Sequence, residues 1–323
     1  MAHPVIAGAM QTAFTTLGKG IQMLFKSRLT AVAIAVALAA CAQTPKLDPN
    51  PPAPRVDAAA QPAAAAWLAD VVAMSDAADA QARRDALQQR MRGLGLQWQG
   101  VPFASGEHQG VNLLADVSGD AAAPLLLLGA HSDKVEHGRG ATDNASGCAT
   151  VLALAERFRR EPLRHHRVAI AFWDLEELGL LGAKAYVADG KTKPALYVNF
   201  DVFGWGDTLW MMAPDAAQPL VAATQSAADA AQLGLSAGDK YPPSDHLPFI
   251  KAGWPAVSYS LIGAPEIPLI LDAYAGKKPK APAKVMQVIH SDADTVGQIE
   301  PVAAARGVDA IEQALRAWDA QSK

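Results

Sequence analysis

The sequence has little cysteine and no marked excess of either charge. Only two of its 323 residues are cysteine, Cys41 and Cys148, which excludes a disulfide framework. Lys and Arg number 28 against 32 Asp and Glu, and no basic stripe carries interleaved aromatics, so we expect no nucleic-acid partner. Half of the residues are hydrophobic, which is enough for most of the chain to form a globular core.

The N-terminal apolar run is short for a membrane-spanning helix, which requires roughly 20 apolar residues. It lies in residues 23–41, MLFKSRLTAVAIAVALAAC, and follows the basic residues Lys26 and Arg28. A positive segment, a short apolar stretch and small residues in that order are the layout of a secretory signal. Residues 38–41, LAAC, resemble a bacterial lipobox, which implies cleavage before Cys41 and lipidation of that cysteine.

This layout predicts three parts of the chain. Residues 1–41 are the signal peptide and lipobox, residues 42–62 a Pro- and Ala-rich linker that cannot bury enough apolar surface to fold, and residues 63–323 the folded domain. We expect the lipid anchor on Cys41 to hold the protein in the cell envelope, at the outer membrane facing the periplasm. An uncleaved anchor helix that ends in a chance cysteine is the alternative.

Helical and strand patterns alternate along the folded domain. Helical spacing covers residues 63–94, 146–160 and 177–189, and strand patterns cover residues 96–103, 110–119, 124–130, 166–174, 195–201 and 253–261. This alternation indicates an α/β fold with a largely parallel sheet between helices, in which continuous apolar runs are strands buried on both faces. Residues 261–285 show no clear period, so we expect a long surface loop there.

Four hydrophobic runs, each of which we interpret as a strand, are followed immediately by acids or histidine. These residues are His131 and Asp133, then Asp174, Glu176 and Glu177, then Asp201, and finally His290, which follows KVMQVI, with Asp294 behind it. In open α/β sheets, ligands bind beyond the carboxyl ends of the strands, so these side chains can converge. Taken singly, each has a structural explanation as a helix cap, a turn former or a surface pair. Four such places at the same end of buried strands favour one common site.

The residue types at these positions suit zinc. Histidine with Asp and Glu forms a borderline-hard set of nitrogen and oxygen ligands. Two neighbouring metals need a bridging carboxylate, and Asp143 lies in a loop of glycine and small residues that allows close approach. Asp133, two residues from His131, is placed to accept the second ring N–H of that histidine. Of the adjacent Glu176 and Glu177, one can bind metal while the other serves as general base for the attacking water.

Five blocks of the sequence, in order from about residue 110 to about residue 300, resemble the M28 family of zinc metallopeptidases. This is the aminopeptidase group with two co-catalytic zinc ions. The blocks are GAHSD with GATDNASGCATVLALAE, VAIAFWDLEELGLLGAKAYV, YVNFDVFGW, SDHLPFIKAGWPAV and VIHSDADT. EELGLLGA and TDNASG are the most specific pieces, and the match covers nearly the whole folded part.

The resemblance implies a mixed sheet of about eight strands between helices and a site with two zinc ions per chain. The implied ligands are His131 and Asp201 for one zinc, Glu177 and His290 for the other, and Asp143 as the bridge. Glu176 is implied as the general base, and Asp133 as the residue that orients His131. The implied reaction hydrolyses a peptide bond and removes the N-terminal residue, so the partners are peptide substrates and, through lipidated Cys41, a membrane.

Two alternatives stay open. SDHLPF, residues 244–249, is also similar to glutaminyl cyclases, which share this fold but use one zinc for acyl transfer; those enzymes usually carry tryptophan where this sequence has Ile289. The other alternative is a lipoprotein that binds metal or peptide without catalysis, although every implied ligand and the base Glu176 are present. The roles of Asp245 and His246, at the site or on a pocket rim, are equally open.

The remaining conspicuous residues favour structural roles. Cys148, at the start of a predicted helix, is expected to be buried and inert. His165 and His166, between a helix and a strand, are expected on the surface. Four aromatic residues near the site blocks can line an apolar pocket or belong to the core, and we favour the core: Trp205, Phe249, Trp254 and Tyr259.

Overall fold

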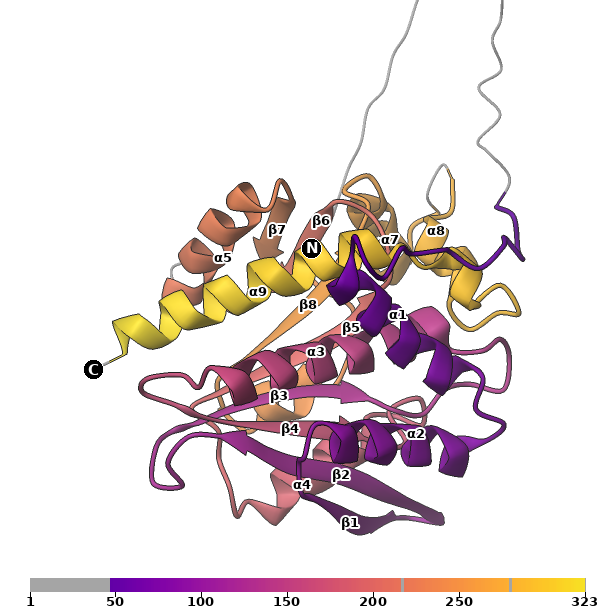
Figure 1. Ribbon diagram of the computed structural model, residues 1–323. Helices are drawn as coiled ribbons and strands as arrows, with labels where there is room; N and C mark the ends of the chain where they lie inside the picture. Colours follow the sequence, from indigo (N-terminus) through magenta and orange to yellow (C-terminus); the bar gives the residue numbers. More distant parts are fainter. Residues whose placement is uncertain (1–46, 216–217, 279–280, 323) are drawn as a thin grey trace, which may run out of the picture. The chain divides into compact units, whose positions relative to one another are not determined.

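The computed structural model describes residues 47–215, 218–278 and 281–322 (Figure 1). The expected signal segment, residues 1–41 with Cys41, lies outside these described residues. Among the helices that are described, none combines the length and the apolar character needed to cross a bilayer.

Within the described residues, eight strands form one mixed sheet in the order β1-β2-β4-β3-β5-β8-β6-β7 (Figure 1). The strands are β1 (Trp98–Ser105), β2 (His108–Ser118), β3 (Leu125–His131), β4 (Arg167–Trp173), β5 (Leu196–Phe203), β6 (Thr208–Met212), β7 (Gly234–Gly238) and β8 (Ala256–Ile262). The central strands β4, β3, β5 and β8 run parallel, and β2 and β6 pair antiparallel on either side of them. The expected α/β fold, with a mixed, largely parallel sheet of about eight strands between helices, is confirmed.

Helices pack on this sheet. They are α1 (Pro62–Ser75), α2 (Ala80–Gly93), α3 (Ser146–Arg160), α4 (Leu181–Asp189), α5 (Pro219–Ala230), α6 (His246–Lys251), α7 (Glu266–Tyr274), α8 (Lys284–Val288) and α9 (Pro301–Gln321), with short turns η1 (Ala141–Ala145) and η2 (Val296–Gln298). The helical stretch predicted over residues 63–94 is two helices rather than one. The second begins after Asp79, whose side chain caps α2 by accepting a hydrogen bond from the N–H of Ala82 at 2.8 Å.

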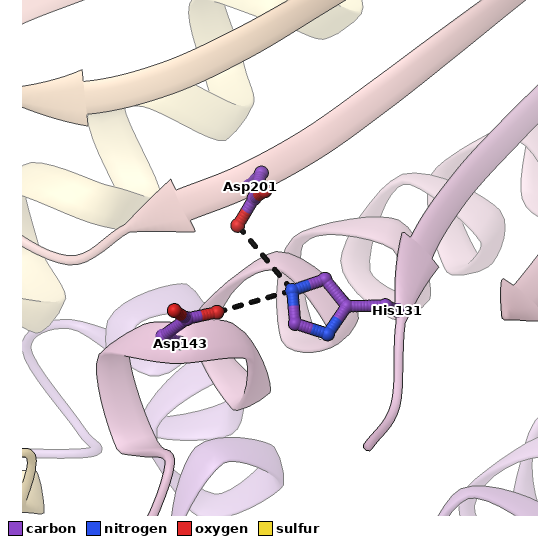
Figure 2. Close-up of side chains that lie close together, drawn as sticks. All are labelled: His131, Asp143 and Asp201. Carbon is purple, nitrogen blue, oxygen red and sulfur yellow. Dashed lines mark ion pairs between the residues drawn. The ribbon is translucent and has the colours of Figure 1, made fainter. Parts of the chain in front are cut away.

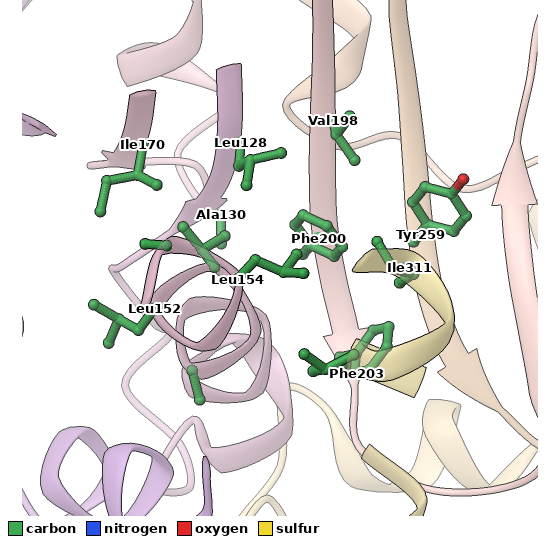
Figure 3. Close-up of a cluster of buried hydrophobic side chains, with 14 of the residues drawn as sticks. Leu128, Ala130, Leu152, Leu154, Ile170, Val198, Phe200, Phe203, Tyr259 and Ile311 are labelled. Carbon is green, nitrogen blue, oxygen red and sulfur yellow. The ribbon is translucent and has the colours of Figure 1, made fainter. Parts of the chain in front are cut away.

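The central strands are apolar throughout because their two faces meet different core clusters. All seven residues of β3 are buried. Leu126 and Leu128 belong to the larger cluster, to which α3 and α9 contribute and part of which Figure 3 shows. Leu125 and Leu127 belong to a second cluster, which α4 and α6 complete on the opposite face.

The surface loop expected over residues 261–285 is wrong, because the stretch contains α7 and leads into α8. Ile267 and Ile270 are buried in α7, three residues apart, as one face of a helix requires. The strand expected just before His290 is also wrong, since that apolar run forms α8. A short apolar run does not distinguish a strand from a buried helical turn by periodicity alone.

Glu266 ties α7 and α8 to the rest of the domain. Its carboxylate accepts a hydrogen bond from the Trp205 indole N–H at 2.7 Å and another from the backbone N–H of Val285 at 2.8 Å. The Lys284 ammonium lies 3.9 Å from the centre of the Trp205 ring, a cation–π contact. These contacts hold both helices in place, although the sequence between them has no regular pattern.

His166 is buried, so the expectation that both His165 and His166 lie on the surface is wrong for His166. Nδ1 of His166 is 2.8 Å from Oδ1 of Asp319, and its ring packs on Trp318 with centroids 4.3 Å apart. Asp319 also accepts the backbone N–H groups of Arg164 and His165. This cluster joins the loop before β4 to the end of α9.

Residues 47–61, which we call the N-terminal strap, have no helix or strand but contact the domain. The Gln298 side chain donates a hydrogen bond to the carbonyl oxygen of Asp48 at 2.9 Å. Gly297 approaches the strap so closely that a Cβ there would lie 2.0 Å from the carbonyl oxygen of Pro51. The strap therefore lies against η2, and glycine is required at the point of closest approach.

Candidate metal centre and active site

Side chains from separate elements converge near the C-terminal ends of β3 and β5. His131 is the last residue of β3, Asp201 lies near the end of β5, and Asp143 lies in η1. Nε2 of His131 is 3.0 Å from Oδ1 of Asp143 and 3.5 Å from Oδ1 of Asp201 (Figure 2). The ligand atoms of these three residues lie within 4.8 Å of one another, close enough to share one cation.

A second group of three residues shares Asp143. Nε2 of His290 is 3.2 Å from Oδ2 of Asp143 and 3.1 Å from Oε2 of Glu177. The ligand atoms of this group also lie within 4.8 Å of one another. Because Oδ1 of Asp143 faces His131 and Oδ2 faces His290, the carboxylate lies between the two groups, as a bridge between two cations requires.

The backbone adopts an unusual conformation at three points in or beside the site. Leu175, Val202 and His290 have φ angles of 60°, 57° and 58°, in the left-handed region that non-glycine residues seldom occupy. Each is a candidate ligand or a direct sequence neighbour of a candidate site residue. Backbone strain of this kind persists only where the surrounding structure holds it, and it collects at functional sites.

Asp133 connects His131 to the two glutamates that follow β4. Its Oδ1 lies 3.4 Å from Nδ1 of His131, a buried ring nitrogen with no hydrogen-bond partner among the described residues. The two oxygens of Asp133 accept the backbone N–H groups of Glu176 and Glu177, each at 3.1 Å. Asp133 therefore holds both glutamates in a defined position relative to the histidine.

Asp294 holds the η1 turn through backbone N–H groups of that turn. Its carboxylate accepts the N–H of Thr142 at 2.6 Å and the N–H of Asp143 at 3.1 Å. Burial raises the pKa of Asp294 to about 7, although these hydrogen bonds oppose the rise. The sequence shows only an acid behind His290, because a contact with an amide about 150 residues away leaves no local pattern.

Arg83 holds the same region from α2, and sequence reasoning missed it. Its side chain is 1% exposed, and its Nε donates to the carbonyl oxygen of Ser132 at 2.9 Å. Its Nη1 donates to the carbonyl oxygens of Met74 at 3.1 Å and Arg139 at 3.2 Å. Nothing in the sequence marks this residue, because α2 carries several basic residues and only the tertiary fold buries one of them.

Carboxyl groups crowd the site, and the pKa values of its residues reflect that. Burial raises the pKa of the Glu176 carboxyl to about 9, against the opposing charge of His131. Hydrogen bonds to Asp143 and Glu177 raise the pKa of His290 to about 10. A cation bound beside these acids favours their ionised forms, so the site is electrostatically suited to positive charge.

The donor set fits a pair of divalent cations. It offers histidine nitrogens together with carboxylate oxygens, the mixture that borderline-hard metals prefer. Oε1 of Glu177 is buried without a hydrogen-bond partner among the described residues, so it is available as a ligand. Burial raises the pKa of Asp143, but its hydrogen bonds with His131 and His290 outweigh this and hold the pKa below its usual range. The Asp143 carboxylate is therefore ionised.

A cavity of about 670 Å³, measured with its open mouth, is lined by the candidate ligands and by Glu176. Much of the remaining lining is apolar and comes from β6, β8, α7, α8 and the residue before His290: Trp210, Ile262, Ile270, Val285, Met286 and Ile289. Apolar walls with a few convergent polar groups are the usual form of a substrate pocket. No sequence signal singles out these wall residues, and three of the six belong to residues 261–285, the stretch without a clear period.

Asp245 and His246 are buried at the start of α6 rather than exposed on a pocket rim. Both carboxyl oxygens of Asp245 and Nδ1 of His246 lack hydrogen-bond partners among the described residues. Burial raises the pKa of Asp245 well above its usual value and lowers that of His246 to about 3, so burial favours the neutral form of each side chain. Their neighbour Ser244 lines the cavity.

Cys148 is buried, as expected. Its Sγ donates to the carbonyl oxygen of His131 at 3.0 Å, and burial raises the pKa of the thiol to about 12, so burial and this pKa both oppose a nucleophilic role. Of the aromatic residues considered for a pocket or a core, Trp205, Phe249 and Tyr259 are buried in the core. Trp254 is partly buried and packs against the core.

Known proteins similar to this chain are peptidases and their relatives. The model of peptidase family M28 matches residues 112–315. Leupeptin-inactivating enzyme 1 of Streptomyces exfoliatus is 34% identical over 227 residues, which cover 66% of this chain and 49% of that enzyme. "Probable lipoprotein aminopeptidase LpqL" of Mycobacterium tuberculosis is 39% identical over 95 residues, or 28% of this chain and 19% of that protein. The chain thus spans about half or less of the length of these relatives.

Three solved structures illustrate the shared fold. The LapA aminopeptidase of Legionella pneumophila has a TM-score of 0.62 at 17% identity, over 80% of this chain and 70% of its own. The glutaminyl cyclase of Porphyromonas gingivalis has a TM-score of 0.63 at 18% identity, over 80% and 98%. BSAP, a zinc aminopeptidase from Bacillus subtilis, has a TM-score of 0.53 at 22% identity, over 66% and 51%. At these identities the likeness establishes the fold. The family match over residues 112–315, most of the folded domain, establishes more: the chain belongs to peptidase family M28.

Proposed function

We propose that the chain is a zinc-dependent aminopeptidase that hydrolyses N-terminal peptide bonds at a dinuclear zinc site. The observation that carries this proposal is the position of Asp143, whose two oxygens each lie beside a different histidine. The proposed ligands are His131 and Asp201 for one zinc, Glu177 and His290 for the other, and Asp143 for both. Membership of family M28 and the zinc aminopeptidase BSAP support zinc as the metal.

Glu176 is the proposed general base. When bound, the zinc ions supply Lewis acidity, which lowers the pKa of a water and polarises the scissile carbonyl. Glu176 lines the cavity beside the ligands, where its carboxylate takes a proton from the attacking water and delivers it to the leaving amine. Asp133 holds the backbone of Glu176 and faces His131, so it keeps the base and the ligand in fixed relation.

A glutaminyl cyclase activity is the second candidate, because the Porphyromonas gingivalis cyclase shares the fold over 98% of its chain. The two cation groups around Asp143 favour the peptidase, as does Ile289 at the position where cyclases usually carry tryptophan. A lipoprotein that binds metal or peptide without catalysis is the third candidate. The presence of Glu176 in the cavity argues against it.

We also propose that lipidated Cys41 anchors the protein to the outer membrane, facing the periplasm. The lipobox-like residues 38–41 support this, and the relative LpqL carries a lipoprotein description of its own. In this proposal residues 1–41 are the signal peptide and lipobox, residues 42–62 the linker and residues 63–323 the peptidase domain. The partners are then a membrane and peptides that reach the cell envelope.

One experiment separates these functions. The full chain, purified in detergent, is analysed for zinc per chain and assayed on aminoacyl anilides beside peptides with N-terminal glutamine. We expect two zinc ions per chain and release of the anilide, lost on chelation and restored by zinc. Loss of ammonia with a pyroglutamyl product would identify a cyclase, and zinc uptake without turnover would identify a binding protein. Labelling with a radioactive fatty acid, compared between the wild type and Cys41→Ala, tests the anchor.

A further inference from the structure

Hydroxyl groups that line the cavity are almost all engaged by the protein itself. Tyr241 shares a short hydrogen bond with Ser260, and Ser260 donates to the carbonyl oxygen of Asp201. Ser244 accepts a hydrogen bond from the side-chain amide of Asn199 at 2.9 Å. The hydroxyl of Tyr274, which also lines the cavity, makes no hydrogen bond to any described residue. It is therefore the lining hydroxyl that is free to bind a substrate.

The helix α7 holds Tyr274 at the cavity. It is the last residue of α7 and lies one helical turn after Ile270, which is 2% exposed and lines the same cavity. Tyr274 itself is 54% exposed, so it stands at the open side of the cavity. Glu266 anchors the start of α7 through Trp205 and Val285, which fixes the helix that presents the phenol.

The electrostatic environment keeps this phenol protonated. Burial raises the pKa of Tyr274, and the charges of four carboxylates that line the cavity raise it further. These carboxylates are Asp201, Asp143, Glu176 and Glu177. The hydroxyl is thus within the field of the ligand cluster and remains an O–H donor near neutral pH.

The cavity is rich in acceptors and poor in donors. Its carboxylates can receive the ammonium group of a peptide N-terminus, but the scissile carbonyl oxygen, on which negative charge develops, requires a donor. Apart from the metal site, the lining offers the indole N–H of Trp210, whose ring packs against Tyr241 with centroids 4.6 Å apart, and the free O–H of Tyr274. Of the two, Trp210 is buried and packs against Tyr241, whereas Tyr274 stands at the open side of the cavity.

We propose that Tyr274 is a catalytic residue that donates a hydrogen bond to the scissile carbonyl oxygen as that oxygen becomes negatively charged. This assignment rests on the proposed aminopeptidase function and adds a residue outside the ligand set. The hydrogen bond strengthens as charge develops, so it stabilises the transition state more than the bound substrate. Its loss therefore lowers kcat and leaves KM nearly unchanged.

The test is the substitution Tyr274→Phe, which removes only the hydroxyl. We expect kcat on an aminoacyl anilide to fall about 100-fold, with KM within about twofold of wild type. A tetrahedral phosphonate analogue of the substrate, titrated by calorimetry, should lose about the same factor in affinity, whereas the product amino acid should bind as before. The matched control is Tyr186→Phe, which removes a hydroxyl that donates to the carbonyl oxygen of Thr192 and does not line the cavity.

Two outcomes would overturn the assignment: Tyr274→Phe with wild-type kcat, or a rise in KM alone with kcat and phosphonate affinity unchanged. Glu176→Gln, assayed beside it, separates this failure from that of the proposed function. If Glu176→Gln is inactive while Tyr274→Phe is fully active, only the role of Tyr274 is wrong. If the wild type does not hydrolyse the anilide, or if Glu176→Gln keeps full activity, the proposed function fails and the role of Tyr274 with it.

Discussion

Asp294 fixes Asp143 through the backbone: its carboxylate accepts the N–H of Asp143 at 3.1 Å and that of the preceding Thr142 at 2.6 Å. Residues that hold a ligand in place typically contribute 10- to 100-fold to metal affinity. We therefore expect Asp294→Ala to weaken zinc binding by about 10-fold or more, as measured by competition with a chelator. The control is Asp292→Asn, because the exposed Asp292 carboxylate pairs with His137 alone among the residues that the structure describes. Equal affinity in both variants would contradict this role for Asp294.

Substitutions of the two adjacent glutamates, Glu176 and Glu177, should have different effects on turnover and on zinc content. Glu176→Gln should lower kcat by about 10²- to 10⁴-fold, because a general base is lost, while zinc content stays at the wild-type level. Glu177→Ala should lose metal, because Oε2 of Glu177 lies 3.1 Å from Nε2 of His290 within the second cation group. Turnover and zinc content are measured on the same preparations. Full activity in both variants would refute the assignment.

Loss of the buried guanidinium of Arg83 should destabilise the fold. Arg83→Met leaves the carbonyl oxygens of Ser132, Met74 and Arg139 without this donor, so we expect unfolding to become easier by about 3 kcal/mol. Urea unfolding of the chain measures the difference. Arg92→Ala is the control from the same helix, since Arg92 is exposed and its guanidinium lies 5.3 Å from the centre of the Trp98 ring. We expect a loss of about 1 kcal/mol or less. A loss of similar size in both variants would show that burial of Arg83 adds nothing.

The contact between His166 and Asp319 should make stability depend on pH. Burial alone would raise the pKa of Asp319, but the hydrogen bonds from His166 and two backbone N–H groups hold it below its ordinary value of 3.8. The ionised form therefore stabilises the fold above that value, and the contribution disappears as the pH falls through the lowered pKa.

Asp319→Asn tests this dependence. We expect it to lower the free energy of unfolding by about 1–3 kcal/mol near neutral pH, and the difference from wild type to shrink in strongly acidic solution. Urea unfolding across a series of pH values measures it. Asp116→Asn, which removes a largely exposed partner of Arg167, should cost well under about 1 kcal/mol and show no such trend. A difference that is constant with pH would mean that charge is not the cause.

Local pattern predicts the central elements well. The spacing over residues 146–160 predicts a helix, and α3 has these bounds. The apolar run that ends at Ala130 predicts β3, because a strand covered on both faces needs no alternation. The convergence of His131 and Asp201 was also foreseeable, since parallel neighbouring strands end at the same edge of the sheet.

Long-range contacts explain what the sequence does not reveal. The helix α7 is tied to the rest of the domain where Glu266 accepts the indole N–H of Trp205, a contact across 61 residues that no window of the sequence contains. Asp294 and Arg83 act on backbone amides and carbonyls of distant loops, so their own residue types carry no sign of it. His166 is buried only because the end of α9 covers it.

The N-terminal strap ties the start of the described chain to η2. The Gln298 side chain donates to the carbonyl oxygen of Asp48, and Gly297 lies against Pro51, so a force applied at the strap would reach η2 before it reaches α1. The contact between the strap and η2 lies a few residues after His290 in the sequence. Cleavage within the strap would therefore remove the partners of Gln298 and Gly297, and the turn between α8 and α9 would lose these two contacts.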